Sequence, residues 1–560
     1  MTNNNQVRVQ RRHNISQIQR PVSDSDEEWS VFWKTQNQDW RIKREISSER
    51  QAYLAKCCKI KSNHKKGSYP FKGIELERAD IEWLLATHEN GRGYVDWNDQ
   101  SHRYSEGLDV RGADLSGMDL SHLPLAHLRG GLTGDEWSEL TREELDEAAR
   151  VNLKGANLEG AHLEGAILRE ACLEDADLSG AHLEKAELVR AQMKNVSLTK
   201  THLEGANLIE VSLEDADLSH AHLEEATLTS AHLQGAILRG TNLERATLHE
   251  AHLEEANLSW ARLEGANFTS AYLQRAYLRG AKLDRVNFNH TVLWDDNGIS
   301  SFFTDVQWGS VNLAVIEWSK IEMLGDEHEA RRKFYDLSTE LKTKDRRLQE
   351  YENAVRANRQ LAVALQAQGL NEDASRFAYH ARALQQRQLW MQLAPWRRIQ
   401  KMKRRVHLIQ ETSLWMRLRL LGRTVERNPT WKLWLRVRNR AYKWFKLWNS
   451  KIRQVVAFFL SFFFGLLAGY GYRPERALAC YIIVIFSFAL AYFTIGHQPF
   501  LPDALVLSLL SFHGRGFFPS INGEITLHSP LVLLAAIEAV IGLFIEMSFI
   551  ATFTQRFFKG

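Results

Sequence analysis

The chain has little cysteine, no apolar segment at its N-terminus and almost no net charge. Its cysteines, Cys57, Cys58, Cys172 and Cys480, form no CxxC pair and follow no regular spacing in 560 residues. A disulfide scaffold and a cysteine-based zinc site are therefore not expected, and a reducing cytosolic compartment fits better. Because the polar start MTNNNQVRVQRRHN contains no apolar stretch, we also expect no cleaved secretory signal.

The sequence also lacks a pattern that points to catalysis. The best candidate for a phosphate loop is the glycine-containing segment 88–93. Its glycines follow a predicted helix, Ala79 to His88, instead of opening a helix after a strand, which is the wrong context for binding phosphate. We find no pairing of a nucleophile with a base, no metal-ligand cluster and no implied cofactor, so we predict that the chain is not an enzyme.

A five-residue repeat dominates the sequence from Val151 to about Asp295. A small residue recurs at every fifth position and a leucine follows two residues later, as in Ala156 with Leu158 and Ala161 with Leu163. The run holds about 29 such units without an insertion, and a fixed short period is typical of a solenoid. Solenoids present long surfaces for binding, which favours a display function.

The units AlaAsnLeuGluGly at 156–160 and AlaAspLeuSerGly at 176–180 resemble the consensus of the pentapeptide-repeat family. The resemblance covers about 200 residues, which we place at 107–320, and implies a right-handed quadrilateral β-helix with four pentapeptides per coil. Residues 131–150 interrupt the repeat as a predicted helical excursion that is capped at Thr133. The tryptophans Trp308 and Trp318 are expected to close the far end of the core.

A coil of twenty residues predicts columns of side chains on the outside of the rod. Two columns stand out, one of histidines and one of glutamates, and their members are His162, His182, His202 and His222 beside Glu164, Glu184, Glu204 and Glu224. We interpret them as solvated neighbours, because imidazoles stacked on a convex wall do not converge on one metal ion. The acidic column could instead mimic DNA, as the resemblance to quinolone-resistance members of the family implies. We expect the rod to bind a protein partner, and we do not expect it to bind nucleic acid.

Helical segments flank the repeat on both sides. Residues 1–66 are predicted to be a disordered and helical N-terminal region, with disorder over 1–30, and residues 67–106 to form an N-terminal cap. Residues 321–396 are predicted to form a helical region, in which residues 359–390 resemble a tetratricopeptide helix pair, with a turn at Gly369 and small residues at Ala374 and Ala381. We expect this pair to act as an adaptor.

Basic and aromatic residues alternate through 397–472, most clearly in TWKLWLRVRNRAYKWFKLW at 430–448. Such a patch can bind nucleic acid or lie on anionic lipid. The patch runs directly into an apolar segment, 455–472, that is barely long enough to span a bilayer. Its position therefore favours the membrane surface, and membrane lipids are an expected partner.

Residues 473–560 have the order of a two-span pore-loop module. The segments Ala477 to Ile495 and Leu531 to Phe553 are long and apolar enough to be predicted as spans. Between them, SLLSFHGRGFFP at 508–519 is similar to the filter region of potassium channels, with Gly542 at the place of the inner-helix hinge. The resemblance implies a tetramer and a constriction, whose residues would be His513, Gly514, Arg515 and Gly516.

The filter departs from the potassium-channel pattern, because Arg515 stands where the family has tyrosine. A ring of arginines repels cations, so potassium conduction is not implied. Within the last span, Glu538 and Glu546 are expected to face the interior of the bundle. The excess of basic residues before the first span and after the last predicts both ends in the cytosol, hence a multi-pass protein of the cell membrane with a large cytoplasmic N-terminal part.

The sequence thus predicts a multi-domain protein with three folded parts. These are the pentapeptide β-helix, an α-helical adaptor similar to a tetratricopeptide pair, and an α-helical transmembrane pore-loop module. The predicted function is binding or assembly with a partner at the rod, coupled to a channel-like pore. The alternative is a static membrane-tethered scaffold, or a DNA-mimicking rod, without ion conduction.

Overall fold

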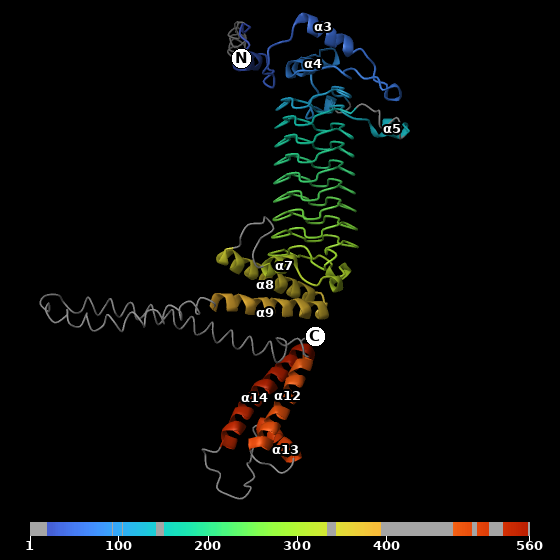
Figure 1. Cartoon of the computed structure of the whole chain (residues 1–560). Helices are drawn as coiled ribbons and strands as arrows, with labels where there is room; N and C mark the ends of the chain where they lie inside the picture. Colours follow the sequence, from blue (N-terminus) through green and yellow to red (C-terminus); the bar gives the residue numbers. More distant parts are fainter. Residues whose placement is uncertain are drawn as a thin grey trace, which may run out of the picture. The chain divides into compact units, whose positions relative to one another are not determined.

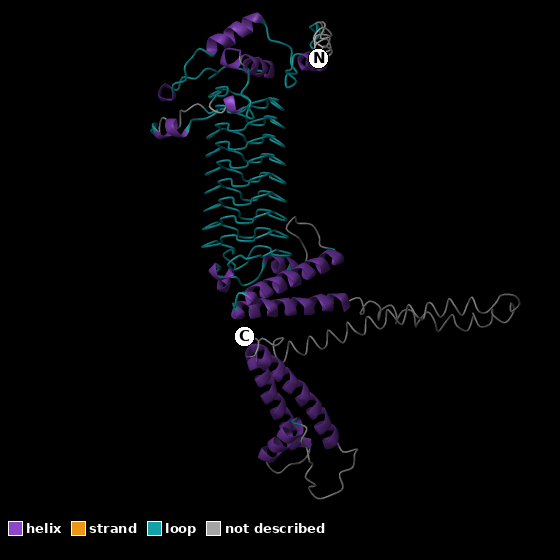
Figure 2. Cartoon of the chain, turned by 180° about the vertical axis from the view of Figure 1, so that it is seen from behind, coloured by secondary structure: helices purple, strands orange, loops and turns teal. Residues whose placement is uncertain are grey.

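The computed structural model describes residues 20–91, 93–102, 105–141, 150–332, 343–393, 474–495, 501–513 and 530–557. The chain divides into two units, Met1–His328 and Glu329–Gly560, and each is described by itself. The first unit consists of N-terminal helices and a rod of stacked coils, and the second is helical in the residues described (Figures 1 and 2). The predicted basic segment 397–472 lies outside the described residues.

The rod is a four-sided coil that repeats every twenty residues. Parallel bridges join each residue of one side to the residue twenty positions later, as in Asn157 to Asp177 and His162 to His182. Each side contributes one bridged residue per coil, so the backbone turns a corner after every five residues. The inward-facing alanines and leucines alternate along the chain, and their side chains have no exposed surface, for example those of Ala166 and Leu168. The predicted β-helix and its inward residues are confirmed.

Threonine replaces the inward alanine at three places without breaking the core. Thr201, Thr241 and Thr291 are buried, and each hydroxyl donates to a backbone carbonyl of the preceding coil, at 2.8, 2.7 and 2.7 Å. A buried hydroxyl without such a partner would cost about 1–3 kcal/mol. The backbone of one coil therefore satisfies the polar group of the next.

The corners of the coil require left-handed backbone geometry. Glycine supplies it at positions such as Gly180 (φ 64°), but many corners carry other residues, including Lys200 (φ 59°). Left-handed geometry costs a residue with a Cβ atom about 1–2 kcal/mol relative to glycine. The rod therefore stores backbone strain at its non-glycine corners.

We expect Lys200→Gly to raise the stability of the rod by about 1 kcal/mol and Gly180→Ala to lower it by a similar amount. A Cβ atom on Gly180 would meet no atom within 4 Å, so the second change tests backbone strain without a steric clash. The free energy of unfolding in urea measures both. Equal midpoints for the two variants would contradict this account of the corners.

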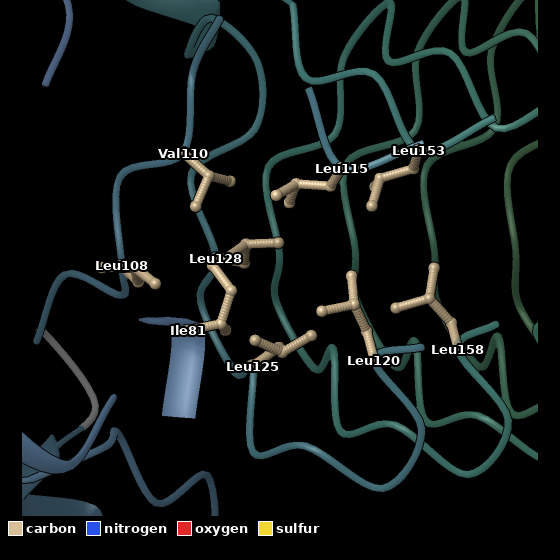
Figure 3. Close-up of a pocket in the computed structure, with 9 residues that line it drawn as sticks. All are labelled: Ile81, Leu108, Val110, Leu115, Leu120, Leu125, Leu128, Leu153 and Leu158. Atoms are coloured by element: carbon tan, nitrogen blue, oxygen red, sulfur yellow. The ribbon is translucent and has the colours of Figure 1, made fainter. Parts of the chain in front are cut away.

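The N-terminal end of the rod is closed by helices. They are α2 (Asp26–Thr35), α3 (Ser48–Cys57), α4 (Arg78–Gly91) and two short 3₁₀ turns, η1 (His64–Lys66) and η2 (Gln100–His102). Ile81 of α4 faces the leucines of the first coils, and together they line a small apolar void (Figure 3). The helix α4 thus covers the open end of the leucine core.

The prediction of disorder over residues 1–30 is wrong from Asp26 onward. Helix α2 begins there with acidic residues in its first turn, and Trp29 and Trp33 are buried. The run SDSDEE is typical of disordered chains, but acidic residues also stabilise the positive end of a helix dipole. Burial of the two indoles then holds the helix in place.

The rod carries two interruptions and ends in buried tryptophans. Helix α5 (Gly134–Ser138) lies in the first interruption and begins with a capping box between Thr133 and Glu136, as predicted. At the far end Trp308 and Trp318 are buried, near the turns η3 (Leu313–Val315) and η4 (Trp318–Lys320). Helix α7 (Gly325–Arg331) follows directly.

Asp326 of α7 is a buried carboxyl at this end of the rod. It accepts hydrogen bonds from the Phe303 amide at 2.7 Å and from the Thr304 hydroxyl. Burial raises the pKa of Asp326 to about 6. In the unfolded chain the carboxyl titrates near its ordinary value, so the folded state holds its proton more tightly. Its contribution is therefore favourable at low pH and is lost as pH rises toward 6.

We expect the stability difference between the natural protein and Asp326→Asn to shift by on the order of 3 kcal/mol between pH 4 and pH 7. The natural protein should lose stability relative to the variant as pH rises through this window, because only the natural protein has a carboxyl to ionise there. Thermal midpoints of the rod measured across pH test it. Asp296→Asn, at an exposed position nearby, is the control, and parallel curves for Asp326→Asn would refute the assignment.

The second unit contains a helical hairpin and a group of three helices. Helices α8 (Lys344–Ala367) and α9 (Asn371–Leu393) pack against each other across a turn at Gly369, with Ala374 and Ala381 buried. Helices α12 (Pro474–Ile495), α13 (Leu501–Phe512) and α14 (Pro530–Phe557) contact one another pairwise. They occupy the places where the sequence predicts span, short helix and span. Within the residues that the structure describes, no helix combines the length and the apolar character needed to cross a membrane.

Candidate functional site

Histidines and glutamates on one side of the rod form two adjacent stacks, which we call the His–Glu column. The histidine rings of successive coils are parallel, with centroids 4.8, 4.8 and 4.9 Å apart. The column consists of the residues named above, His162, His182, His202 and His222 with Glu164, Glu184, Glu204 and Glu224. The stacking predicted from the twenty-residue coil is therefore observed.

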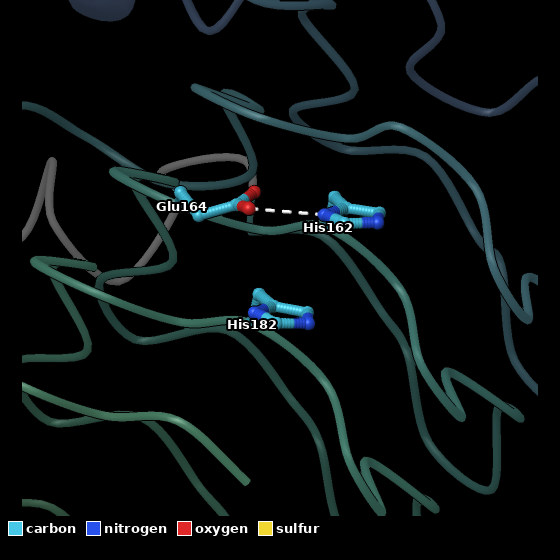
Figure 4. A group of neighbouring side chains, drawn as sticks. All are labelled: His162, Glu164 and His182. Atoms are coloured by element: carbon cyan, nitrogen blue, oxygen red, sulfur yellow. Dashed lines mark hydrogen bonds and ion pairs between the residues drawn. The ribbon is translucent and has the colours of Figure 1, made fainter. Parts of the chain in front are cut away.

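Each histidine of the His–Glu column contacts the glutamate two residues later in its own coil. The distances between Nδ1 and Oε1 are 3.0, 3.3, 3.2 and 3.5 Å along the column. The spacing His-Leu-Glu points the leucine inward and leaves its two neighbours outside, where they meet at the corner. Figure 4 shows the first pair, His162 with Glu164, and the His182 ring of the next coil.

The N-terminal end of the column is the most enclosed. Glu164 is only 4% exposed, and the hydrogen bond that it accepts raises the pKa of His162. Trp97 lies close by, with its ring 5.3 Å from that of His127 and 5.9 Å from the Lys185 ammonium. The second oxygen of Glu164 is buried and has no hydrogen-bond partner, and the same holds for Glu184, Glu204 and Glu224.

The helices α12, α13 and α14 enclose a different polar group. Glu538 of α14 is buried and accepts hydrogen bonds from Tyr492 Oη of α12 at 2.8 Å and from Ser508 Oγ of α13. The Ser508 hydroxyl also lies 2.9 Å from the Ile485 carbonyl oxygen. The sequence singled out Glu538 but neither of its partners, because tyrosine and serine within apolar helices carry no distinctive pattern.

A second polar group lies where α13 ends. His513 contacts Glu546 of α14 through Nδ1 and the Tyr481 hydroxyl of α12 through Nε2, the latter at 3.1 Å. His513 and Glu546 were predicted for different places, the constriction and the bundle interior, and here they are paired. The other three constriction residues, Gly514, Arg515 and Gly516, lie outside the described residues.

Large apolar side chains are exposed on all three of these helices. On α12, Ile483 is 63% exposed and Phe486 and Leu490 are 58% exposed. The others are Leu478, Ile482, Phe493, Val506, Leu509, Leu510, Leu533, Ile537, Val540, Leu543, Met547 and Ile550. So many exposed large apolar side chains on three short stretches of helix are uncommon on water-facing proteins.

Comparison with known proteins identifies the rod. The family model described as pentapeptide repeats matches residues 149–184, 186–224, 226–265 and 256–295. No curated relative matches the chain.

Solved structures of pentapeptide-repeat proteins also match part of the chain. HetL of Nostoc sp. strain PCC 7120, involved in heterocyst differentiation regulation, is 24% identical over 42% of this chain and 99% of its own, with a TM-score of 0.28. The fluoroquinolone resistance protein QnrB1 is 15% identical over 36% of this chain and 86% of its own, with a TM-score of 0.20. The Nostoc protein alr5209 is 36% identical over 20% of this chain and 83% of its own, with a TM-score of 0.14. The family model thus identifies residues 149–295 as pentapeptide repeats, which is the part of the chain that forms the rod.

Proposed function

We propose that this protein is a membrane-attached, non-catalytic binding protein, in which the rod engages a protein partner and the helices α12, α13 and α14 sit in lipid. The inverted polarity of these helices carries the proposal. Their buried interior holds Glu538, Ser508 and Tyr492, while their outer surface presents leucine, isoleucine and phenylalanine. Such an arrangement stabilises a protein whose surroundings are apolar.

Lipid is the occupant favoured for this surface because of the sequence that precedes it. The segment 397–472 alternates basic and aromatic residues and leads directly to α12. Lysine and arginine bind anionic headgroups, and tryptophan favours the depth at which headgroups meet acyl chains. A second copy of the chain could also cover the apolar faces, and the test below separates the two.

A channel-like module is the finer form of the proposal. The order of long helix, short helix, loop and long helix supports it, as do the polar contacts that Glu538 and Glu546 make with the short helix or with the residue after it. In this form the module is a tetramer, its constriction is formed by His513, Gly514, Arg515 and Gly516, and the large N-terminal part is cytoplasmic. A static scaffold without conduction is the alternative.

The rod's outer surface supports binding of a protein more than mimicry of DNA. Most carboxylates of the His–Glu column are paired with histidine and half-buried, and Glu164 is nearly inaccessible. A DNA mimic needs exposed, unpaired charge at phosphate-like spacing. Elsewhere positive and negative residues of adjacent coils pair with each other, as Lys154 does with Glu174 at 2.7 Å.

Lipid contact is tested with the triple variant Ile483→Asn, Phe486→Asn and Leu490→Asn in the full-length protein. These side chains are exposed, so the variant should fold, yet it should be released from liposomes by alkaline carbonate while the natural protein is retained. Ile237→Asn, at an apolar residue of the rod that is 40% exposed, is the matched control. Unchanged retention with a change in oligomeric mass would contradict lipid contact and indicate pairing of copies. Labelling of cysteines introduced at either end of α14 with a reagent that cannot cross the bilayer then distinguishes two arrangements. A helix that crosses the membrane exposes its two ends on opposite sides, whereas insertion into one leaflet leaves both ends on the same side.

Conduction is tested separately by measuring flux of chloride and of potassium through liposomes that hold the full-length protein. A pore predicts flux that Arg515→Ala alters in rate or ion preference, because the substitution removes positive charge from the constriction. Absence of flux for both ions, with insertion demonstrated, would favour the static scaffold.

A further inference from the structure

The His–Glu column lacks positive charge to balance its carboxylates. Glu164, Glu184, Glu204 and Glu224 follow one another at every coil, and in the described part of the chain each pairs with a histidine of its own coil. Glu224 also accepts a hydrogen bond from the neutral Asn242 amide. Like charges at this spacing repel one another, and burial strengthens the repulsion. Each carboxylate also keeps one buried oxygen without a hydrogen-bond partner. The carboxylates of the column therefore favour binding of an additional cation, which the other ion pairs on the surface of the rod do not need.

The ligand atoms for such a cation come together between neighbouring coils. One nitrogen from His162, one nitrogen from His182 and one oxygen from Glu164 all lie within 4.8 Å of one another. Two similar groups occur further along, one with His182, Glu184 and His202 and one with Glu204, His222 and Glu224. Imidazole and carboxylate together suit zinc and its neighbours in the first transition row.

We propose that the N-terminal end of the His–Glu column binds one divalent transition-metal ion, with His162, Glu164 and His182 as its protein ligands (Figure 4). Glu164 distinguishes this end, since its side chain is 6% exposed while the side chains of Glu184, Glu204 and Glu224 are 27–35% exposed. A buried carboxylate with an unpaired oxygen gains most from a bound cation, because water cannot solvate it.

Binding requires a small movement of the histidine rings. Zinc lies about 2.0–2.1 Å from nitrogen and oxygen ligands, so in a tetrahedral site any two ligand atoms must come within about 3.4 Å of each other. The rings of His162 and His182 are 50% and 35% exposed, and they can tilt toward the ion while the backbone coils stay in place. Three protein ligands leave one tetrahedral position for water. The sequence argument that a convex wall keeps the imidazoles apart overlooks the glutamate, whose carboxylate bonds to the His162 ring and lies within 4.8 Å of a ring nitrogen of His182.

The rod contains a matched pair that should not bind the ion in this way. His252 contacts Glu254 at 3.2 Å and stacks between His232 and Tyr272, as the rings of the His–Glu column do. The coils on either side place Gln234 and Gln274 where the column has glutamate. The pair therefore has a single carboxylate and no three-ligand group among the described residues.

The test is titration of the untagged full-length protein with Co²⁺ and Zn²⁺ alone at pH 7.5. We expect a visible Co²⁺ spectrum of tetrahedral type, displaced by one equivalent of Zn²⁺. Glu164→Gln and His182→Asn should each weaken Co²⁺ binding by more than about tenfold. Glu254→Gln should leave it unchanged. Circular dichroism of each variant checks that the rod remains folded.

Three outcomes would overturn the proposal. The first is no spectral change with Co²⁺ at millimolar concentration. The second is equal loss of binding in Glu164→Gln and Glu254→Gln, which would show nonspecific binding by surface histidines. The third is normal Co²⁺ binding by the folded variant that combines Glu164→Gln with His182→Asn.

Discussion

Replacing Glu82 by alanine is expected to detach the N-terminal helices from the rod and to lower stability by about 3–5 kcal/mol. Glu82 is completely buried in α4 and accepts hydrogen bonds from the amides of Ile42 and Lys43 at 3.1 and 2.9 Å. It also pairs with Arg78 at 2.9 Å. The substitution would leave two buried amide groups without this acceptor and would leave the buried Arg78 guanidinium paired only with the half-exposed Asp119 carboxylate at 3.1 Å. Breaking a buried ion pair and its hydrogen bonds is among the costliest changes in a folded protein.

The same contact explains why the effect should reach the rod. Arg78 donates to the carbonyl oxygens of Asp119 and Ser121, both at 3.1 Å, in the first coils. Limited proteolysis within residues 36–47, together with the free energy of unfolding, would measure detachment. Glu77→Ala, at an exposed residue directly before α4, is the control. Equal resistance of Glu82→Ala and Glu77→Ala to proteolysis within residues 36–47 would contradict the role of Glu82 in holding the N-terminal helices on the rod.

Replacing Gly542 by alanine is expected to separate α13 from α14, at a cost of about 3 kcal/mol. A Cβ atom on Gly542 would lie 2.1 Å from the Phe512 carbonyl oxygen, far inside contact distance. In an unconstrained helix the same change would stabilise by nearly 1 kcal/mol, because alanine favours helix more than glycine does. A loss of stability in Gly542→Ala would therefore support the close contact between α13 and α14, and a gain would contradict it.

The measurement is the thermal midpoint of the detergent-solubilised full-length protein, followed through its helical signal and its dispersity. Leu543→Ala changes the next residue, whose side chain is 55% exposed, and should leave the midpoint nearly unchanged. A midpoint that rises in Gly542→Ala would exclude the close contact. Helix α14 runs unbroken through this position, so close packing accounts for the glycine here, whereas the sequence suggested a hinge.

The rod could be predicted from sequence because its contacts repeat. Every inward alanine and leucine has the same neighbours twenty residues away, so local pattern and distant contact carry the same information. The paired histidines and glutamates of the His–Glu column followed from the same period. The left-handed backbone conformation at the corners could not be predicted in this way. The coil imposes it on lysine, glutamate and aspartate, which do not favour it themselves.

The contacts outside the rod could not be predicted in the same way. Glu82 reaches Ile42 and Lys43 across about forty residues, and Glu538 meets Tyr492 and Ser508 from three separate helices. Nothing periodic connects these positions. The pairing of His513 with Glu546 likewise joins the end of one helix to the middle of another. For such residues, sequence indicates which side chain needs a partner but not which partner it finds.

The bridges of the rod show how it tolerates added residues. Where the chain gains residues before Val151, the bridged partners lie 38 apart, as in Pro124 to His162, and where it gains residues after Val292 they lie 25 apart, as in Tyr277 to Phe302. On both occasions the extra chain leaves the coil and the bridges resume on the same side. A single pentapeptide kept within the coil would instead turn every later side chain by roughly a quarter of a revolution. The rod thus sets rotational orientation as well as distance. Inserted loops leave the orientation of later side chains unchanged, and whole coils of twenty residues change only the length of the rod. Single repeats would rotate every residue beyond them about the rod axis.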